Sequence, residues 1–377
     1  MPAPATQQSA PMFQIIDNHA AITPQFITAW RTLSEQARIP NPFWDPDFCI
    51  AAIKLVAPDT IKIATLTNPD GSLAALAPFS IQRAMKFGPK VAMLWTHDYI
   101  PRGTPLVAPN DEAAFEALLH GIVTKTGVPL VANALKQMPE LGEISKRRLS
   151  THIISTHQCA AVRSTQPSEV YRRATLSKQR RQGLDRRFRR LRERTAHLGT
   201  LEIDLCRDPK IVPSRFEAFM RLEKIGWKGN DKTALLNNER HAAFAREAIL
   251  KLAGRQSAMV ATLKAGETVL AALTLFQING EAFSWKTTFD ENYKECSPGT
   301  QLLARFADPI MGNGEKFSLD SCAAPNNEIA NAIWGEREIV QNIIFSTPAQ
   351  SALASVIKYS EQLKQRAKQI AKAILKR

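Results

Sequence analysis

The stretch 61–81, IKIATLTNPDGSLAALAPFSI, aligns without a gap with the stretch 258–278, AMVATLKAGETVLAALTLFQI. Nine of the 21 aligned positions are identical, at an offset of 197 residues. Each copy has two β-rich runs separated by polar turn residues, at 68–71 in the first and 265–267 in the second, which predicts a β-hairpin. An ungapped match across a whole hairpin indicates an internal duplication.

The second copy continues into further predicted elements. Asn279 and Gly280 are typical of a tight hairpin turn, and the residues after them predict a third antiparallel strand. The expected fold class is therefore mixed α/β (α+β). The expected order is a helix over 238–252, strands over 258–264, 268–278 and 281–289, a helix over 301–311 that ends at 312–314, a strand over 316–322 and a helix over 326–338.

Several strings in the second half resemble the GNAT acyltransferases, and more specifically the CelD-like, cellulose-biosynthesis-associated acetyltransferase family. They are EKIGWKGNDKTALL from Glu223, WKTTFDENYKECSPGTQLL from Trp285, LDSC at 319–322 and IWGERE at 333–338. The resemblance covers 175–338 strongly and the N-terminal half more loosely. It implies tandem GNAT domains, each a mostly antiparallel twisted sheet flanked by helices, in a plan similar to that of the FemABX peptidyltransferases.

Three consecutive regions follow from this resemblance. We expect a degenerate GNAT-like domain over 1–160, a GNAT acyltransferase domain over 161–345 that opens with an arginine-rich helix, and a basic amphipathic helix over 346–377. The first copy keeps Gly103 and Thr104 in the loop that corresponds to 297–301, but Pro105 and Pro109 follow within one turn's length of each other. Proline cannot donate the helical hydrogen bond, so no continuous helix and no cofactor site are expected there.

The resemblance implies that acetyl-CoA or another acyl-CoA is the donor. The residues implied to hold its pyrophosphate are Ser297, Pro298, Gly299, Thr300 and Gln301. Physically, the first turn of a helix offers unpaired N–H groups and a partial positive charge to a phosphate. The alternative interpretation is a plain turn between a strand and a helix.

Direct attack of an amine or hydroxyl on a thioester needs a base, an oxyanion donor and orientation. Glu223, at the end of a predicted helix, and Asp320, at the end of a predicted strand, are the candidate bases. Tyr293 is the candidate proton donor to the leaving thiolate. For the carboxylates the alternative is a capping or salt-bridged structural role, and Tyr293 can instead pack in the core.

Trp227, Lys228 and Lys286 are the candidate acceptor-binding residues. An indole beside an ammonium group suits an anionic or sugar-like acceptor, and the alternative is a packed loop with Trp227 as a hydrophobic plug. The acceptor is expected to be a small molecule or glycan that offers an amine or hydroxyl, in polysaccharide or cell-envelope biosynthesis.

Other chemistries leave no trace in the sequence. Gly-x-Ser-x-Gly, Walker and His-Glu-x-x-His motifs are absent, and the five cysteines lack zinc or redox spacing. His152, His157 and Cys159 alternate as in a strand, so no metal is expected. Residues 1–10 do not resemble a secretory signal, which favours a cytoplasmic protein, with a peripheral position at the inner membrane face as the extension of that expectation.

Two segments carry the whole net charge of +14. Residues 171–194 have a net charge of +9, and residues 356–377 have one of +6. The first predicts a helix over 175–198 whose arginines form either a solvated face or a ridge that binds RNA, an anionic polysaccharide or a phospholipid surface. The tail 349–377 is expected to dock on the body, lie on an anionic membrane or pair with a partner helix.

Three functions remain open at this point. The first is a GNAT-type acyltransferase that uses acyl-CoA. The second is a FemABX-like transferase that takes an aminoacyl group from charged tRNA. The third is a non-catalytic accessory protein that keeps the fold for binding.

Overall fold

The computed structural model of the chain describes 11–17, 19–57, 60–84, 88–109, 111–138, 148–311, 316–325 and 327–375. The turn predicted at 312–314 and the helix start predicted at Asn326 lie outside these residues, as do residues 1–10.

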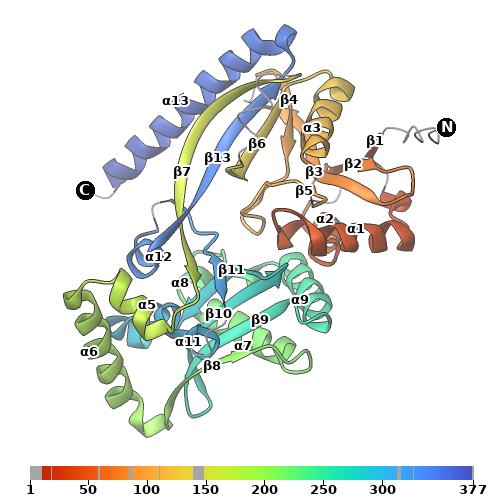
Figure 1. Cartoon of the computed structure of the whole chain (residues 1–377). Helices are drawn as coiled ribbons and strands as arrows, with labels where there is room; N and C mark the ends of the chain where they lie inside the picture. Colours follow the sequence, from red (N-terminus) through yellow and green to blue (C-terminus); the bar gives the residue numbers. More distant parts are fainter. Residues whose placement is uncertain are drawn as a thin grey trace, which may run out of the picture. The chain divides into compact units, whose positions relative to one another are not determined.

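The chain forms two compact units (Figure 1). Unit 1 consists of residues 1–46, 59–157 and 339–377, and unit 2 of 47–58 and 158–338. Each unit therefore gathers segments that are far apart in the sequence. The boundary predicted between 160 and 161 falls inside strand β7 (Ser150–Ser164), whose two parts belong to different units.

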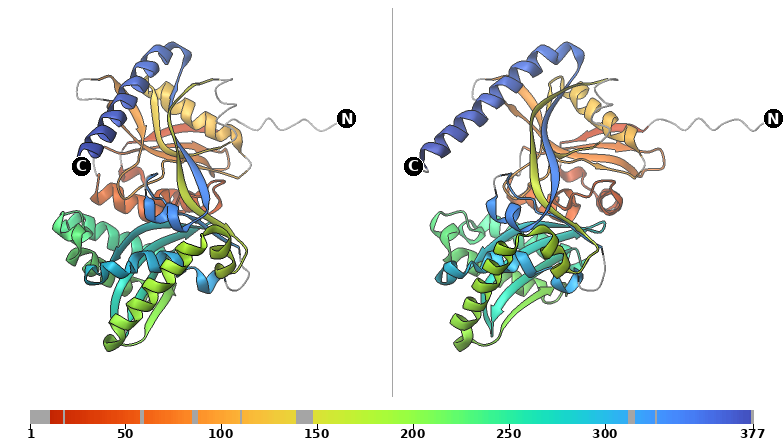
Figure 2. Two further views of the ribbon diagram at one scale, coloured as in Figure 1. Left: turned by 90° about the vertical axis from the view of Figure 1, so that its left-hand side faces the viewer. Right: turned by 60° about the vertical axis from the view of Figure 1, so that its left-hand side comes forward.

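In unit 1, the predicted hairpin over 61–81 is confirmed, with Ile63 opposite Pro78 and Leu66 opposite Ala75. The first part of β7 lies beside β13 (Figure 2). The sheet order is β1 (Met12–Ile16), β2 (Lys62–Thr67), β3 (Leu73–Arg83), β4 (Lys90–Leu94), β6 (Leu130–Lys136), β13 (Glu336–Ser346) and β7, with β5 (Leu106–Val107) on β3. The α-helices are α1 (Pro24–Gln36), α3 (Glu112–Thr126) and α13 (Ser351–Leu375).

The loop after β4 is packed into unit 1. The amide of Gly103 donates to the carbonyl of Ala134, and the amide of Lys136 donates to the hydroxyl of Thr104. Arg102 and Thr104 are buried. As Pro105 predicts, residues 101–109 form no helix.

In unit 2, the sheet order is β7, β12 (Phe317–Asp320), β11 (Glu281–Phe289), β10 (Thr268–Ile278), β9 (Ala258–Ala265) and β8 (Leu201–Cys206). The predicted three-strand meander β9–β10–β11 is confirmed. Its second turn has φ of 46° at Asn279 and 73° at Gly280, as the sequence indicated. β11 and β12 run parallel.

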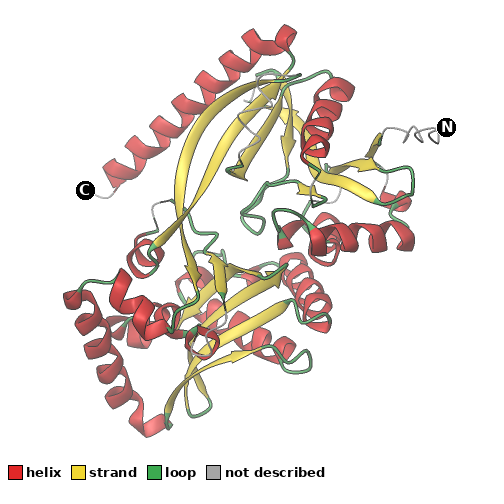
Figure 3. Cartoon of the chain, viewed as in Figure 1, coloured by secondary structure: helices red, strands yellow, loops and turns green. Residues whose placement is uncertain are grey.

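Helices cover both faces of the unit 2 sheet (Figure 3), which is why β9 and β10 are apolar along nearly their whole length. The α-helices of this unit are α2 (Pro46–Leu55), α5 (Ser168–Thr175), α6 (Lys178–Thr195), α7 (Val212–Ile225), α8 (Trp227–Asn230), α9 (Glu239–Gly254), α10 (Pro298–Arg305), α11 (Asp308–Met311) and α12 (Glu328–Ile333). The 3-10 helices of the two units are His19–Ala21, Pro42–Trp44, Ala196–Leu198, Leu235–Asn237, Glu291–Cys296 and Pro348–Gln350.

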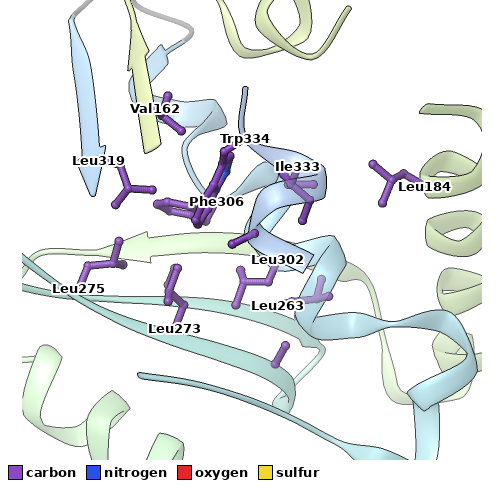
Figure 4. Packing of buried hydrophobic residues seen from close by; sticks show 14 of the residues in the cluster. Val162, Leu184, Leu263, Leu273, Leu275, Leu302, Phe306, Leu319, Ile333 and Trp334 are labelled. Atoms are coloured by element: carbon purple, nitrogen blue, oxygen red, sulfur yellow. The ribbon is translucent and has the colours of Figure 1, made fainter. Parts of the chain in front are cut away.

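One face of this sheet packs on α10, with Leu302 and Phe306 buried against Leu273 and Leu275 of β10 (Figure 4). The other face carries an aromatic cluster. Its members are Phe48 of α2, Phe216 of α7, Phe244 of α9, Phe276 of β10 and Trp285 of β11. The position of α10 relative to the sheet is thus fixed by a dense apolar core.

Two predicted helices have different limits in the structure. The helix predicted over 301–311 begins at Pro298 and ends at Arg305, and α11 follows as a separate turn. Pro309 supplies no N–H for the carbonyl of Arg305, so the helix breaks there. The helix predicted to run to 338 ends at Ile333, and the chain then enters β13.

The arginine-rich helix predicted over 175–198 is α6, preceded by a separate helix, α5. Leu184 and Leu191 are buried, and Phe188 packs beside them, so the predicted apolar face is confirmed. Among the helices of the described ranges, none is long and apolar enough to span a membrane.

Candidate functional site

The first turn of α10 contains two backbone amides that donate to no acceptor in the described part of the chain. Ser297 precedes the helix with φ 54° and ψ 55°, and its hydroxyl caps none of the helix amides. The first hydrogen bond of the helix runs from the Gln301 amide to the Ser297 carbonyl. The amides of Gly299 and Thr300 have no acceptor within the described part of the chain. Amides without an acceptor at a helix start are able to bind an anion.

The residues predicted to hold the pyrophosphate are largely enclosed by the protein. Pro298, Gly299 and Gln301 are buried, and Thr300 is half-buried. The Gln301 side chain accepts from Arg305 at 2.6 Å. Of the five predicted residues, Ser297 and Thr300 are the ones that are partly exposed.

A cavity of about 170 Å³ adjoins Thr300 between α6, α10 and α12. Its charged lining residues are Arg180 and Arg187 of α6 and Glu328 of α12. The Nε atom of Arg187 is buried and has no hydrogen-bond partner among the described residues. The cavity is smaller than the roughly 300–1,000 Å³ of typical ligand pockets, and most of its lining surface is apolar, from Leu184, Ile329, Ala332 and Ile333.

β11 and β12 are paired over a short length only. They pair only at Ala282 with Leu319 and at Phe283 with Asp320. After Phe283, no described residue pairs with β11 on this edge. Such a separation exposes backbone groups in the middle of a sheet, where they can bind an extended ligand.

Glu223 forms the centre of a buried charge cluster. Its side chain is fully buried, and Oε1 lies 3.2 Å from Nζ of Lys228 and 3.2 Å from Nζ of Lys286. Oε2 accepts from the amide of Leu235 at 2.9 Å. Lys228 also donates to the carbonyl of Thr287 on β11, at 2.8 Å. Three residues predicted for the site are thus brought together.

The environment lowers the pKa of Lys228. Burial is the largest cause, the charge of Lys286 adds to it, and the Glu223 carboxylate opposes both. The cluster therefore holds two ammonium groups against one carboxylate in a poorly solvated place.

Trp227 lies at the edge of this cluster and is 50 % exposed. Its amide donates to the carboxylate of Glu291 at 2.6 Å, and Lys228 lies 5.9 Å from the indole centroid. A side chain at Gly229 would place Cβ 1.7 Å from the carbonyl oxygen of Lys224, so only glycine permits this turn. The WKG string thereby presents an indole to solvent rather than filling the core.

Asp320 and Tyr293 lie apart from the Glu223 cluster in the contacts of the described residues. Asp320 is fully buried at the end of β12, and Oδ1 accepts from the amide of Cys322 at 2.8 Å. Tyr293 packs against the core of unit 2, and the guanidinium of Arg194 lies 5.3 Å from its ring centroid.

Residues 177–322 match the family model described as an acetyltransferase (GNAT) domain. Most of unit 2 is thus similar to a GNAT acetyltransferase domain. The matched segment includes α6, the Glu223 cluster, the start of α10 and Asp320. No curated protein sequence matches the chain.

Solved structures share this fold at low sequence identity. A conserved protein of unknown function from Bacteroides thetaiotaomicron has a TM-score of 0.54 and 11% identity, over 89% of this chain and 100% of its own. The C-terminal domain of a putative lysylphosphatidylglycerol synthetase from Agrobacterium fabrum has a TM-score of 0.52 and 16% sequence identity, and the match covers 88% of this chain and 95% of that domain. FemX has a TM-score of 0.53 and 8% sequence identity, and the match covers 88% of this chain and 98% of FemX. At these identities the likeness concerns the fold alone.

Sequence analysis did not predict three residues that lie near the candidate site in unit 2. Arg180 and Arg187 have the spacing of one helix face, but nothing in the sequence places that face beside Thr300. Glu291 is likewise distant in sequence from the Trp227 amide that it binds. Within the described residues, no group of three or more His, Cys, Asp or Glu residues has the geometry of a metal site.

Proposed function

We propose that this protein is a GNAT-type acyltransferase that moves an acetyl or other acyl group from CoA to an amine or hydroxyl. The observation that supports this function best is the start of α10, where two amides have no acceptor among the described residues and Thr300 lines a cavity together with two arginines. In this proposal the amides of Gly299 and Thr300, with Arg180 and Arg187, hold the diphosphate of the donor.

The separated strands β11 and β12 would receive the thioester. The acceptor nitrogen or oxygen attacks the thioester carbon, the C–S bond breaks, and the thiolate takes a proton. Tyr293 is our proposed proton donor. Asp320 is our proposed base, because it ends β12 at the last residue that pairs with β11.

Glu223 then acts as a positioning residue. It holds Lys228 and Lys286 beside β11, where their charge would attract an anionic acceptor or stabilise developing negative charge. The exposed indole of Trp227 would contact the apolar side of that acceptor. We further propose that the protein is related to the CelD-like acetyltransferases and that its acceptor is a polysaccharide or a cell-envelope component.

Thr300→Asp tests donor binding. A carboxylate in the first turn favours the helix by about 0.3–1 kcal/mol, but it repels a diphosphate. Acetyl-CoA at one hundred times its Kd should stabilise the wild-type protein by about 2.7 kcal/mol, measured as a rise in Tm. We expect Thr300→Asp to lose this rise without a lower Tm in the absence of ligand.

Thr300→Asn is the matched neutral control and should keep most of the rise in Tm. If acetyl-CoA does not stabilise the wild-type protein, or stabilises Thr300→Asp equally, then the proposed donor site is wrong.

The second candidate function, aminoacyl transfer from charged tRNA, is favoured by the outer face of α6. The side chains of Arg180, Arg186, Arg189 and Arg190 have no acidic partner among the described residues. Binding of tRNA with a steep salt dependence that Arg186→Gln/Arg189→Gln reduces would support it. Absence of both tRNA and acyl-CoA binding would instead favour the non-catalytic function.

The helix α13 supports a peripheral interaction. Ala354 and Ile357 pack on unit 1, while Val356 and Leu363 are exposed. We propose that 349–377 contacts an anionic membrane surface or a partner helix. Unchanged sedimentation with anionic vesicles after deletion of 349–377 would exclude the membrane contact.

A further inference from the structure

A second cavity, of about 630 Å³, lies at the junction of α5 and α6. It adjoins Arg305, the last residue of α10, and thus the opposite end of that helix from Gly299 and Thr300. Its lining residues, all in unit 2, are Glu169, Arg172, Arg173, Leu176, Lys178, Arg181, Gln182, Leu184, Asp185 and Arg305.

The lining of this cavity is strongly basic, with five cationic side chains against two carboxylates. The carboxylates are already engaged, Glu169 with Arg173 and Asp185 with Arg305. Lys178 has no partner among the described residues, and Arg181 donates only to backbone carbonyls. The cavity therefore contains positive charge that the protein does not neutralise.

The guanidinium groups are held in place before any ligand arrives. Arg172 donates to Asp308 at 2.6 Å and to the carbonyl of Ala304 at 3.2 Å. Arg305 donates to Asp185 and stacks 4.5 Å from the centroid of Phe188. Burial lowers the pKa of Arg305, and the charge of Arg172 lowers it further, which indicates crowded positive charge.

The start of α6 adds to this field. Ser177 caps the amide of Arg180 through its hydroxyl, and the amide of Arg181 donates to the Ser177 carbonyl. The amides of Lys178 and Gln179 have no acceptor in the described part of the chain. A helix of 18 residues thus directs its positive end toward the cavity.

We propose that this cavity is a second anion site, separate from the donor site, and that it binds a small soluble molecule that carries two or more phosphate groups. Arginines and a lysine fixed around a concave space match the charge and geometry of phosphate oxygens. The volume lies in the range of small-molecule pockets. Nucleic acid is disfavoured because none of the described lining residues is aromatic, so bases have no stacking partner.

The test is calorimetric titration of the full chain with inorganic pyrophosphate at low salt. Arg173→Gln/Lys178→Gln removes two exposed charges from the lining, and we expect about tenfold weaker binding. The matched control, Arg190→Gln/Arg207→Gln, removes the same charge from exposed positions outside the cavity. It should bind within about twofold of the wild-type protein.

The background variant Thr300→Asp distinguishes the two anion sites. Pyrophosphate binding that survives in Thr300→Asp and weakens in Arg173→Gln/Lys178→Gln supports the second site, whether or not acetyl-CoA binds. Loss of binding in Thr300→Asp would assign the anion to the start of α10 and overturn the proposal. Equal weakening by the control pair, or displacement of pyrophosphate by tRNA or by phosphatidylglycerol vesicles, would overturn it as well.

Discussion

Glu223 compensates two ammonium groups at once. Lys228 and Lys286 both lie 3.2 Å from its Oε1 atom, and its other oxygen holds the amide of Leu235. Loss of the carboxylate removes the negative charge that both half-buried ammonium groups share, although Lys228 keeps its hydrogen bond to the Thr287 carbonyl. Loss of one lysine leaves a paired carboxylate. The three members of the cluster are therefore unequal in their effect on stability.

We expect Glu223→Gln to lower the free energy of unfolding by about 3–5 kcal/mol, the usual effect of breaking a buried ion pair. Lys228→Met should cost less than half as much, because Glu223 keeps Lys286. Urea denaturation at pH 7 measures both. Equal costs for the two variants would contradict the central role of Glu223.

Tyr171 links α5 to the start of β13. Its buried hydroxyl donates to Glu336 at 2.5 Å and accepts from the amide of Gly335 at 3.0 Å. Burial, and then the bond to Glu336, raise its pKa above the usual value. The stabilising effect of the protonated form is thus complete below about pH 10, the unfolded value, and is lost as the pH rises toward the folded value.

Tyr171→Phe should destabilise the protein by about 1–3 kcal/mol at pH 8, since Gly335 and Glu336 lose a buried partner. The difference from the wild-type protein should shrink above pH 10. Urea denaturation at pH 8 and pH 10.5 measures this change. A difference that stays constant across this interval would show that the hydroxyl is not the cause.

At the scale of elements, α2 illustrates packing that no local pattern predicts. Nothing in the local sequence of α2 indicates that Phe48 joins Phe244, Phe276 and Trp285 of unit 2. Asp47 makes a further link, since Arg255 donates to it at 2.8 Å. The helix supplies core to a unit whose other segments begin at residue 158.

Phe48→Ala should cost about 3–5 kcal/mol in the free energy of unfolding, as for other buried aromatic residues. The exposed Lys54 on the same helix provides the control, and Lys54→Ala should stay within about 0.5 kcal/mol. Thermal unfolding followed by tryptophan fluorescence compares the two. A mild effect of Phe48→Ala would mean that α2 is dispensable for the unit 2 core.

The sequence predicted the strands of the structure better than its helix limits. The duplicated hairpin, the Asn279–Gly280 turn and β11 follow from local residue types and are confirmed. Pro309 favours a helix break, whereas the apolar spacing around it predicts a continuous helix over 301–311. The pairing of Glu223 with Lys286 depends on tertiary packing between α7 and β11, which periodicity does not encode.

At the scale of the whole molecule, the two copies of the hairpin have different surroundings. In unit 2, α10 begins with two amides that have no acceptor among the described residues, and β11 and β12 pair over only two residues. In unit 1, the corresponding residues form a packed loop whose Gly103 and Thr104 bond to β6. Repetition of the sheet has therefore not repeated the helix start.

We expect one acetyl-CoA per chain, measured by calorimetric titration of the wild-type protein. The reason is that unit 1 has no helix over 101–109 to offer amides to a diphosphate. Thr300→Asp should abolish this single binding event. A stoichiometry of two would show that the loop of unit 1 rearranges to receive the donor.

The interleaving of the two units has a consequence for synthesis on the ribosome. Unit 2 has all its segments once residue 338 has emerged, whereas unit 1 still lacks most of β13 and all of α13. The half that starts first must therefore wait as an incomplete sheet with an unpaired edge at β6. Synthesis from the N-terminus thus completes the second unit before the first. A premature stop after residue 338 would leave an aggregation-prone N-terminal half tethered to a complete unit 2.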